Sequence, residues 1–282
     1  MRIALLAVVV AVCSSSSPKT ETPPPPPSGS DVRPSSTGPL TEEEFKAMHS
    51  TAPAPGTYEA LGTTIDLAGT KAYLGVPKGT GPFPAIVVIH EWWGKNQHIE
   101  HWADRLASAG WAAIAVDLYG GVVATDKDTA MSAMKSVDDA KAAATISAAL
   151  EYVSTDPKIK ATRKAVIGWC FGGGWSFKTA LGHPELSGAI IYYGQVETDP
   201  AKLAPIKAKV MGVFATKDKG IPVATVDAFE AGLAKAGVTA KIYRYDAEHA
   251  FANPSNPIYD ETSASDAWNH VLEFLGSLAA QQ

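Results

Sequence analysis

Short runs of consecutive apolar residues recur from about residue 57 onward, and stretches with helical periodicity separate them. The runs within 84–91 (PAIVVIHE) and 112–119 (AAIAVDLY) show no alternation of apolar and polar residues. A strand without a polar face is expected to be covered on both sides, as in a parallel sheet between two layers of helices. Such runs, alternating with helices, predict an α/β fold with a mostly parallel, doubly wound sheet.

Turn residues and periodicity indicate the remaining elements. Residues 63–77 are expected to form a strand pair bent near Gly69, and further strands are expected at 164–170, 188–194, 209–218 and 240–246. A helix over 98–109 carries Trp102 and Leu106 on one face and ends at Gly110. Other helical regions are expected over 127–154, which is rich in alanine, and over 173–181, 223–236 and 265–278.

The first residues have the pattern of a signal peptide, expected over residues 1–13. Arg2 precedes an apolar run over 3–12, which is about half as long as a membrane span requires. The motif VAVCSSSS around Cys13 is similar to the lipobox of bacterial lipoproteins, although Val12 stands where a small residue is usual. We therefore expect an exported protein, either periplasmic or anchored to a membrane through lipidated Cys13, and otherwise secreted. A plain signal peptide, an uncleaved anchor and a disordered apolar start are the alternatives.

A polar segment separates this N-terminus from the rest of the chain. Residues 14–40 are rich in Ser, Pro and Thr, so they cannot bury enough apolar surface to offset their conformational entropy. We expect residues 14–56 to form a disordered tether with a short helix over 41–48, begun by Thr41 and Glu44 as a capping box. Residues 57–282 then form one domain. A net charge of −5 over 282 residues offers no basic surface for nucleic acid.

Four reactive side chains follow the ends of predicted strands, namely Glu91, Cys170, Asp218 and His249. Because ligands of doubly wound sheets bind at the carboxyl ends of the strands, these side chains are expected to share one site. Cys170 stands between two glycines in GWCFG (168–172), which is the pattern of a nucleophile elbow. The order nucleophile, acid, histidine along the chain is that of an α/β-hydrolase triad.

Most of these residues also have a structural explanation. Cys170 could be a packed core cysteine on a glycine-rich turn, and Asp218 could cap the helix that follows it. His249 is preferred as the base over the histidines at 90, 183 and 270, which lie in a strand, at a helix end and in the last helix. His98 and His101 lie one turn apart without a third ligand of suitable spacing, so we expect a solvated helix start and no metal.

Residues from about 57 to 278 resemble the dienelactone hydrolase (carboxymethylenebutenolidase) family. The resemblance rests on five motifs in the family's order: VVIHEWWGKN, ADRLASAGWAAIAVDLYGG, IGWCFGGGW, ATKD and AEHAFAN. It implies an α/β-hydrolase fold and a catalytic triad of Cys170, Asp218 and His249. It also implies that Glu91 holds the thiol proton until substrate binds.

The expected chemistry is covalent catalysis by the thiol. The backbone N–H groups of Trp92 and Phe171 are expected to form the oxyanion hole. A tetrahedral intermediate held there would collapse to a thioester, which water then opens. This reaction requires no metal and no organic cofactor.

Aromatic side chains near the predicted strand ends would suit a flat or lactone-like substrate. The expected pocket residues are Trp93, Tyr119, Trp169, Phe251 and Asn253. Similar enzymes hold a substrate carboxylate with arginines, which this chain lacks after DLY and after HAFA, where Asn253 stands. We expect a monomeric enzyme that hydrolyses an ester or a dienelactone-like lactone. A general carboxylesterase or thioesterase, and an exported lipoprotein that binds ligands without catalysis, are the alternatives.

Overall fold

The structure is a computed structural model that describes Lys46 and residues 62–280. The predicted signal peptide with Cys13, the predicted tether and, except for Lys46, the predicted helix over 41–48 lie outside the described residues. No helix within the described part of the chain is both long and apolar enough to cross a membrane.

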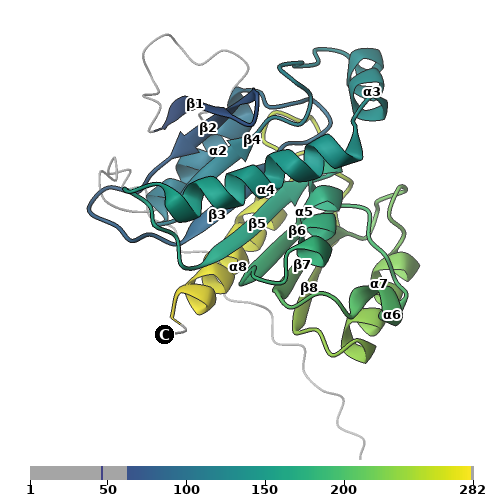
Figure 1. Ribbon diagram of the computed structural model, residues 1–282. Coiled ribbons are helices and arrows are strands. Elements are labelled where there is room, and N and C mark those ends of the chain that lie inside the picture. The colour runs from purple at the N-terminus through teal and green to yellow at the C-terminus, as the bar shows by residue number, and fades with distance from the viewer. Residues whose placement is uncertain (1–45, 47–61, 281–282) are drawn as a thin grey trace, which may run out of the picture. The chain divides into compact units, whose positions relative to one another are not determined.

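Within the described residues, eight strands form one sheet in the order β1-β2-β4-β3-β5-β6-β7-β8 (Figure 1). The strands are β1 (Thr63–Leu67), β2 (Thr70–Gly75), β3 (Ala85–Ile89), β4 (Ala112–Val116), β5 (Lys164–Trp169), β6 (Gly188–Tyr192), β7 (Lys209–Ala215) and β8 (Ala240–Tyr245). β1 and β2 form an antiparallel hairpin, β2 runs antiparallel to β4, and the other pairs are parallel. The predicted α/β fold with a mostly parallel sheet is therefore confirmed.

The helices are α2 (Gln97–Ser108), α3 (Lys127–Lys135), α4 (Asp139–Thr155), α5 (Phe171–Gly182), α6 (Pro200–Leu203), α7 (Val223–Lys235) and α8 (Glu261–Ala279). The alanine-rich helical region predicted over 127–154 is divided into α3 and α4. The division falls before Asp138, whose side chain caps α4 by accepting hydrogen bonds from the backbone N–H groups of Ala140 and Lys141. The short helix α6 was not predicted, because four residues show no periodicity.

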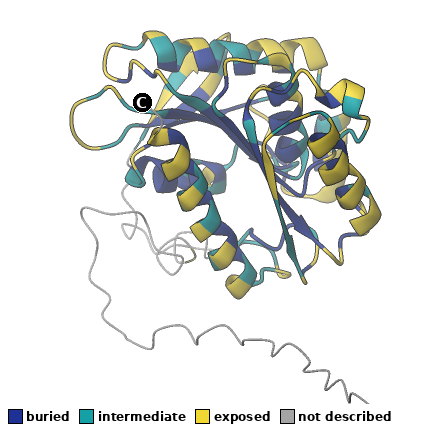
Figure 2. Ribbon diagram, turned by 90° about the horizontal axis from the view of Figure 1, so that it is seen from below, coloured by how far each residue is buried: buried dark blue, intermediate teal, exposed yellow. Residues whose placement is uncertain are grey.

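Helices cover both faces of the sheet (Figure 1). The side chains of β3 alternate between these faces: Val87 and Ile89 belong to the cluster formed with α4, α5 and α7, and Ile86 and Val88 to the cluster formed with α2 and α8. Figure 2 shows the buried strands between helices whose outer faces are exposed. Removing each such side chain from water contributes about 1.5–3 kcal/mol. Burial on both faces explains why the strand sequences show no alternation.

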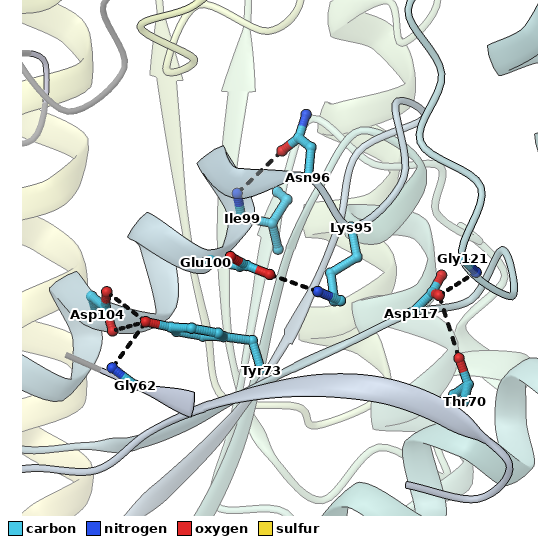
Figure 3. Close-up of polar contacts among 10 residues, drawn as sticks. All are labelled: Gly62, Thr70, Tyr73, Lys95, Asn96, Ile99, Glu100, Asp104, Asp117 and Gly121. Atoms are coloured by element: carbon cyan, nitrogen blue, oxygen red, sulfur yellow. Dashed lines mark hydrogen bonds and ion pairs between the residues drawn. The ribbon is translucent and has the colours of Figure 1, made fainter. Parts of the chain in front are cut away.

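Polar side chains shape the loops at the carboxyl ends of β3 and β4 (Figure 3). Asn96 caps α2 by accepting a hydrogen bond from the Ile99 N–H at 3.3 Å. After β4, the buried Asp117 carboxylate accepts hydrogen bonds from the backbone N–H groups of Tyr119 and Gly121. These contacts hold the two loops that carry several of the predicted site residues.

Candidate active site

Cys170 stands on a sharp turn between β5 and α5. Its φ of 55° and ψ of −115° lie in a region that residues with a side chain rarely adopt. Its backbone N–H donates to the Tyr192 carbonyl at 3.0 Å, and the residue is only partly buried. A strained backbone between a strand and a helix is the geometry that holds a nucleophile at the carboxyl end of a sheet.

Three glycines allow the chain to pass through this turn. A Cβ on Gly168 would lie 2.1 Å from the Gly172 carbonyl oxygen, and a Cβ on Gly172 would lie 2.2 Å from the Ile89 carbonyl oxygen. A Cβ on Gly173 would lie 2.3 Å from the Tyr192 carbonyl oxygen. No side chain fits at such distances, so the close approach of α5 to the sheet requires glycine at all three positions.

Phe171 and Trp92, the two residues expected to supply the oxyanion hole, lie at the start of α5 and in the loop after β3. Phe171 is the first residue of α5, so its N–H has no acceptor within the helix and lies at the positive end of the helix dipole. Trp92 follows Glu91, and its ring lies 4.8 Å from the ring of Trp93. A backbone N–H at a helix N-terminus is suited to stabilise a developing oxyanion.

Asp218 and His249 are joined by a hydrogen bond of 2.6 Å between Oδ2 and Nδ1. Asp218 is buried after β7, and its Oδ1 accepts hydrogen bonds from the backbone N–H groups of Gly220 and Ile221 at 2.8 and 3.1 Å. Burial raises the pKa of Asp218, but the contacts with His249 and with these backbone groups outweigh it and hold the pKa below its ordinary value. The cap of α7 is Pro222, so Asp218 is not the residue that begins that helix. An ionised Asp218 orients the imidazole through Nδ1.

His249, in the turn after β8, interacts with both Asp218 and Cys170. Burial lowers the pKa of His249, but its hydrogen bonds and electrostatic contacts with these two side chains outweigh burial and raise the pKa to about 10. The imidazole therefore links the carboxylate after β7 to the thiol on the β5–α5 turn. The three side chains that the sequence predicted to share a site thus lie together in the structure.

Glu91 carries a buried carboxyl at the end of β3. The residue is 6% exposed, and its Oε2 accepts a hydrogen bond from Asn253 Nδ2 at 2.5 Å. Its Oε1 has no hydrogen-bond partner among residues 62–280. Burial raises the pKa of Glu91 to about 7, although the Asn253 hydrogen bond and the nearby His249 lower it. A carboxyl with this pKa can hold or release a proton near neutral pH.

His90 supports Glu91, and sequence reasoning missed it. The Leu118 N–H donates to His90 Nε2 at 3.1 Å, so Nδ1 carries the ring proton and donates to the Glu91 carbonyl at 2.6 Å. Burial lowers the pKa of His90 to about 4, so the ring is neutral at pH 7. The sequence shows that His90 precedes Glu91, but no local pattern shows that its ring reaches the loop after β4.

A second residue missed from the sequence is Tyr193. It follows β6 with a φ of 34°, which is rare for an aromatic residue, and it is fully buried. Its ring lies 5.1 Å from the imidazole of His249, and its N–H donates to the Val213 carbonyl at 2.7 Å. The strained backbone thus holds an aromatic ring against the histidine. The Tyr-Tyr-Gly sequence at a strand end is only a weak signal for this role.

Two of the expected pocket residues lie beside Glu91. Trp93 and Asn253 line a small cavity together with the Glu91 side chain. Tyr119 is half-buried, and its ring lies 5.3 Å from the ring of Phe171. These three residues border the loops that carry the candidate catalytic groups.

The other two expected pocket residues are buried in the core. Trp169 is 1% exposed and its ring lies 4.5 Å from that of Trp102, while Phe251 is fully buried and packs near Tyr193. Successive side chains of a strand point to opposite faces, so the ring before Cys170 turns into the core. Trp169 and Phe251 therefore support the site through packing and do not form an open pocket wall.

The structure corrects the expectation for the histidines of α2. His101 is 1% exposed, because α2 is buried at Ile99 and from His101 to Ala107, so it does not lie on a solvated helix start. Burial lowers the pKa of His101 to about 4. The rings of His98 and His101 lie 5.9 Å apart. No group of three or more His, Cys, Asp or Glu side chains within the described residues could hold a metal ion.

Comparison with known proteins places the chain in a family. The family model of the dienelactone hydrolase family matches residues 70–279. A protein of Methylorubrum extorquens named "Putative carboxymethylenebutenolidase" is 31% identical over 218 residues, which cover 72% of this chain and 75% of that protein.

Solved structures show the same fold. The structure named "Putative Dienelactone Hydrolase" from Klebsiella pneumoniae superposes with a TM-score of 0.71 at 28% identity, covering 76% of this chain and 98% of that chain. A dienelactone hydrolase-like promiscuous phosphotriesterase from metagenomic libraries, at 24% identity and a TM-score of 0.70, shares the fold over 77% of this chain and 98% of its own. The predicted α/β-hydrolase fold is therefore confirmed, and the chain belongs to the dienelactone hydrolase family.

Proposed function

We propose that this protein hydrolyses an ester or a dienelactone-like lactone through a triad of Cys170, His249 and Asp218. The observation that carries the proposal is the hydrogen bond of 2.6 Å between Asp218 and His249, whose imidazole also contacts the thiol on its strained turn. A nucleophile, a base within reach and an acid that orients the base are the three parts that covalent hydrolysis requires.

The first half of the reaction forms a thioester. Because the pKa of His249 is raised to about 10, the imidazole holds the proton of the thiol. Cys170 Sγ attacks the carbonyl carbon as a thiolate, and the carbonyl electron pair moves to oxygen. When the tetrahedral intermediate collapses, the bond to the alkoxide breaks and His249 gives its proton to the departing oxygen. An ester releases an alcohol, whereas a lactone opens and keeps the new hydroxyl on the acyl group.

The second half returns the free enzyme. Water attacks the thioester while His249 takes one of its protons, and the second tetrahedral intermediate expels the thiolate. The thiolate regains a proton from His249, and the product leaves as a carboxylic acid. The backbone N–H groups of Phe171 and Trp92 stabilise the oxyanion in both halves. In other enzymes, removing one such donor lowers kcat by a factor of about 10²–10³.

Glu91 regulates the thiol in the resting enzyme. Its pKa of about 7 lets it hold or release a proton near neutral pH. A protonated Glu91 leaves no negative charge beside a thiolate, whereas an ionised Glu91 disfavours the thiolate. While Glu91 is ionised, the thiol stays protonated and is less open to oxidation, which suits an exported enzyme.

A panel of substrates tests the proposed function. Wild-type protein and Cys170→Ala are compared on p-nitrophenyl acetate, dienelactone and simple lactones. Turnover that is lost in Cys170→Ala supports the proposal, and the preferred member of the panel identifies the substrate class. Equal turnover by both proteins contradicts Cys170 as the nucleophile. No turnover by either, combined with an unreactive Cys170 in alkylation by iodoacetamide, favours a binding protein without catalysis.

A general carboxylesterase or thioesterase is the second candidate. The observation that favours it is the hydrogen bonding of the uncharged Asn253, which stands where similar enzymes have a substrate-binding arginine. The amide of Asn253 is bonded to Glu91 on one side and to Ser255 on the other, so the site gains no positive charge from this position. On the same panel, this candidate predicts a preference for uncharged esters over the negatively charged dienelactone.

We also propose that the protein is exported, with Cys13 as its lipidation site. The support is the charged start, the apolar run over 3–12 and the motif VAVCSSSS. Mass spectrometry of protein made in its native host tests this. A mature chain that begins at lipid-modified Cys13 is expected, while a chain that still begins at unmodified Met1 contradicts export.

A further inference from the structure

The hydrogen bonds around Asn253 determine the orientation of its amide. Asn253 Oδ1 accepts hydrogen bonds from the Ser255 backbone N–H at 2.9 Å and from the Ser255 hydroxyl at 2.5 Å. A backbone N–H can only donate, so the amide oxygen must lie on the Ser255 side and the amide nitrogen on the Glu91 side. The nitrogen donates to Glu91 Oε2 at 2.5 Å.

This orientation gives the two carboxyl oxygens of Glu91 different hydrogen-bonding environments. Oε2 accepts from an obligatory donor, and because this bond is strongest to an unprotonated oxygen, it favours a proton on Oε1. Oε1 is buried without a hydrogen-bond partner in the described part of the chain. Glu91 and Asn253 also line a small cavity with Trp93 and His98, with room for about one water molecule.

From this geometry we infer that Asn253 is a positioning residue that fixes the Glu91 carboxyl, so that Glu91 takes up and releases its proton through Oε1. The inference deepens the proposed function, because it rests on Glu91 as the group whose charge regulates the thiol. Asn253 thus acts through Glu91, and it is not a residue that binds the substrate.

The groups that face Glu91 agree with this role. His249 approaches from the turn after β8 and Tyr193 from the end of β6, and both interact electrostatically with Glu91. His98 of α2 borders the cavity. Asn253 adds a donor without adding a charge, so it stabilises the ionised carboxylate less than a guanidinium would. The buried carboxyl can therefore change its protonation state near neutral pH.

A carboxyl titration measured in the full chain tests the inference without any substrate. Protein labelled with ¹³C at the glutamate side-chain carboxyl gives an NMR signal that is assigned to Glu91 by its absence in Glu91→Gln. Because the amide donor favours the carboxylate, Asn253→Ala is expected to move the Glu91 titration to higher pH. Asn253→Asp, which keeps the volume but loses the donor and adds a charge, is expected to move it further.

Kinetics in two backgrounds separate positioning from substrate binding. Asn253→Ala is expected to lower kcat/KM about tenfold and to shift its pH profile as the carboxyl titration shifts. In the Glu91→Gln background, the same substitution is expected to have no further effect. Asn256→Ala is the matched control, because the Asn256 side chain bonds the Ile258 N–H within the same loop. Neither the titration nor the pH profile is expected to move in this control.

Two results would overturn the inference. One is an unchanged Glu91 titration in folded Asn253→Ala and Asn253→Asp, with folding checked by near-ultraviolet circular dichroism. The other is a rise in KM caused by Asn253→Ala that is of equal size in the wild-type and the Glu91→Gln backgrounds, since that is the behaviour of a substrate-binding residue. The failure of the proposed function is distinct, because the titration still shifts in a protein that hydrolyses no ester.

Discussion

Glu91 carries a carboxyl whose ionisation destabilises the folded protein. Its pKa is raised to about 7 in the folded state by burial, whereas the ordinary value is 4.5. The folded state therefore binds the proton more tightly, and the free energy of unfolding falls as pH rises from 4.5 to 7. Well above pH 7 the whole loss in the free energy of unfolding is present, and it amounts to about 3 kcal/mol.

The substitution Glu91→Gln should accordingly stabilise the protein at high pH. Gln resembles the neutral carboxyl and still offers an oxygen to Asn253, so the cost of ionisation disappears. At pH 8 we expect the free energy of unfolding to rise by about 2–3 kcal/mol, and at pH 4 we expect almost no change. Urea denaturation at the two pH values measures both differences.

Glu248→Gln provides the control, because this glutamate is exposed in the same protein. It should change the free energy of unfolding by less than about 0.5 kcal/mol at both pH values. An equal change in Glu91→Gln at pH 4 and pH 8 would contradict a raised pKa for Glu91.

Single residues also mark the limit of what the sequence could predict. Glu91, Cys170 and His249 follow strand ends, so the topology alone brings them to one edge of the sheet. The hydrogen bond from Asn253 to Glu91 joins residues 162 positions apart, and no local sequence pattern predicts it. His90 and Tyr193 were missed for the same reason, because their roles depend on which loops meet in space.

The turn between β5 and α5 is the element on which the site depends, and Gly172 tests it. A methyl group on Gly172 would lie 2.2 Å from the Ile89 carbonyl oxygen and 2.6 Å from that of His90, both of which are backbone atoms. Gly172→Ala must therefore push α5 away from β3. We expect a loss of about 3 kcal/mol in the free energy of unfolding and a large fall in kcat. Thermal unfolding and ester hydrolysis measure the two effects.

Gly182→Ala is the matched change in the same helix. Apart from its chain neighbours and the backbone of its own helix, no atom lies within 4 Å of a Cβ at Gly182, and alanine favours helix more than glycine does. Stability should be unchanged or raised by up to about 1 kcal/mol, with activity retained. If both substitutions had the same effect, the close contact at Gly172 would not be what requires glycine there.

Most elements could be predicted from local sequence, and the exceptions have physical reasons. Apolar runs identified the strands because each is buried on both faces. The break between α3 and α4 was missed because alanine favours helix throughout that region, whereas the cap at Asp138 starts a new helix. The burial of His101 depends on the packing of α2 against its neighbours, which periodicity alone does not show.

At the scale of the whole molecule, the members of both hydrophobic clusters within the described residues lie between Leu67 and Leu278. Among residues 62–280, this stretch supplies the side chains that pack both faces of the sheet. Lys46 forms an exposed ion pair with Glu261, and an exposed pair contributes at most about 1 kcal/mol. A protein that begins at Thr57 should therefore unfold at a urea concentration close to that of the full chain and keep its kcat/KM. A lower midpoint for the shorter protein would show that residues before Thr57 contribute to folding.

The central claim is that Cys170 carries the acyl group during turnover. The most direct test is to mix the full-length enzyme with p-nitrophenyl acetate, quench rapidly with acid and map the acetyl group by peptide mass spectrometry. We predict one acetyl group on the peptide that contains Cys170, released by hydroxylamine and absent in Cys170→Ala. An acetyl group on another residue, or unchanged turnover in Cys170→Ala, would contradict the account.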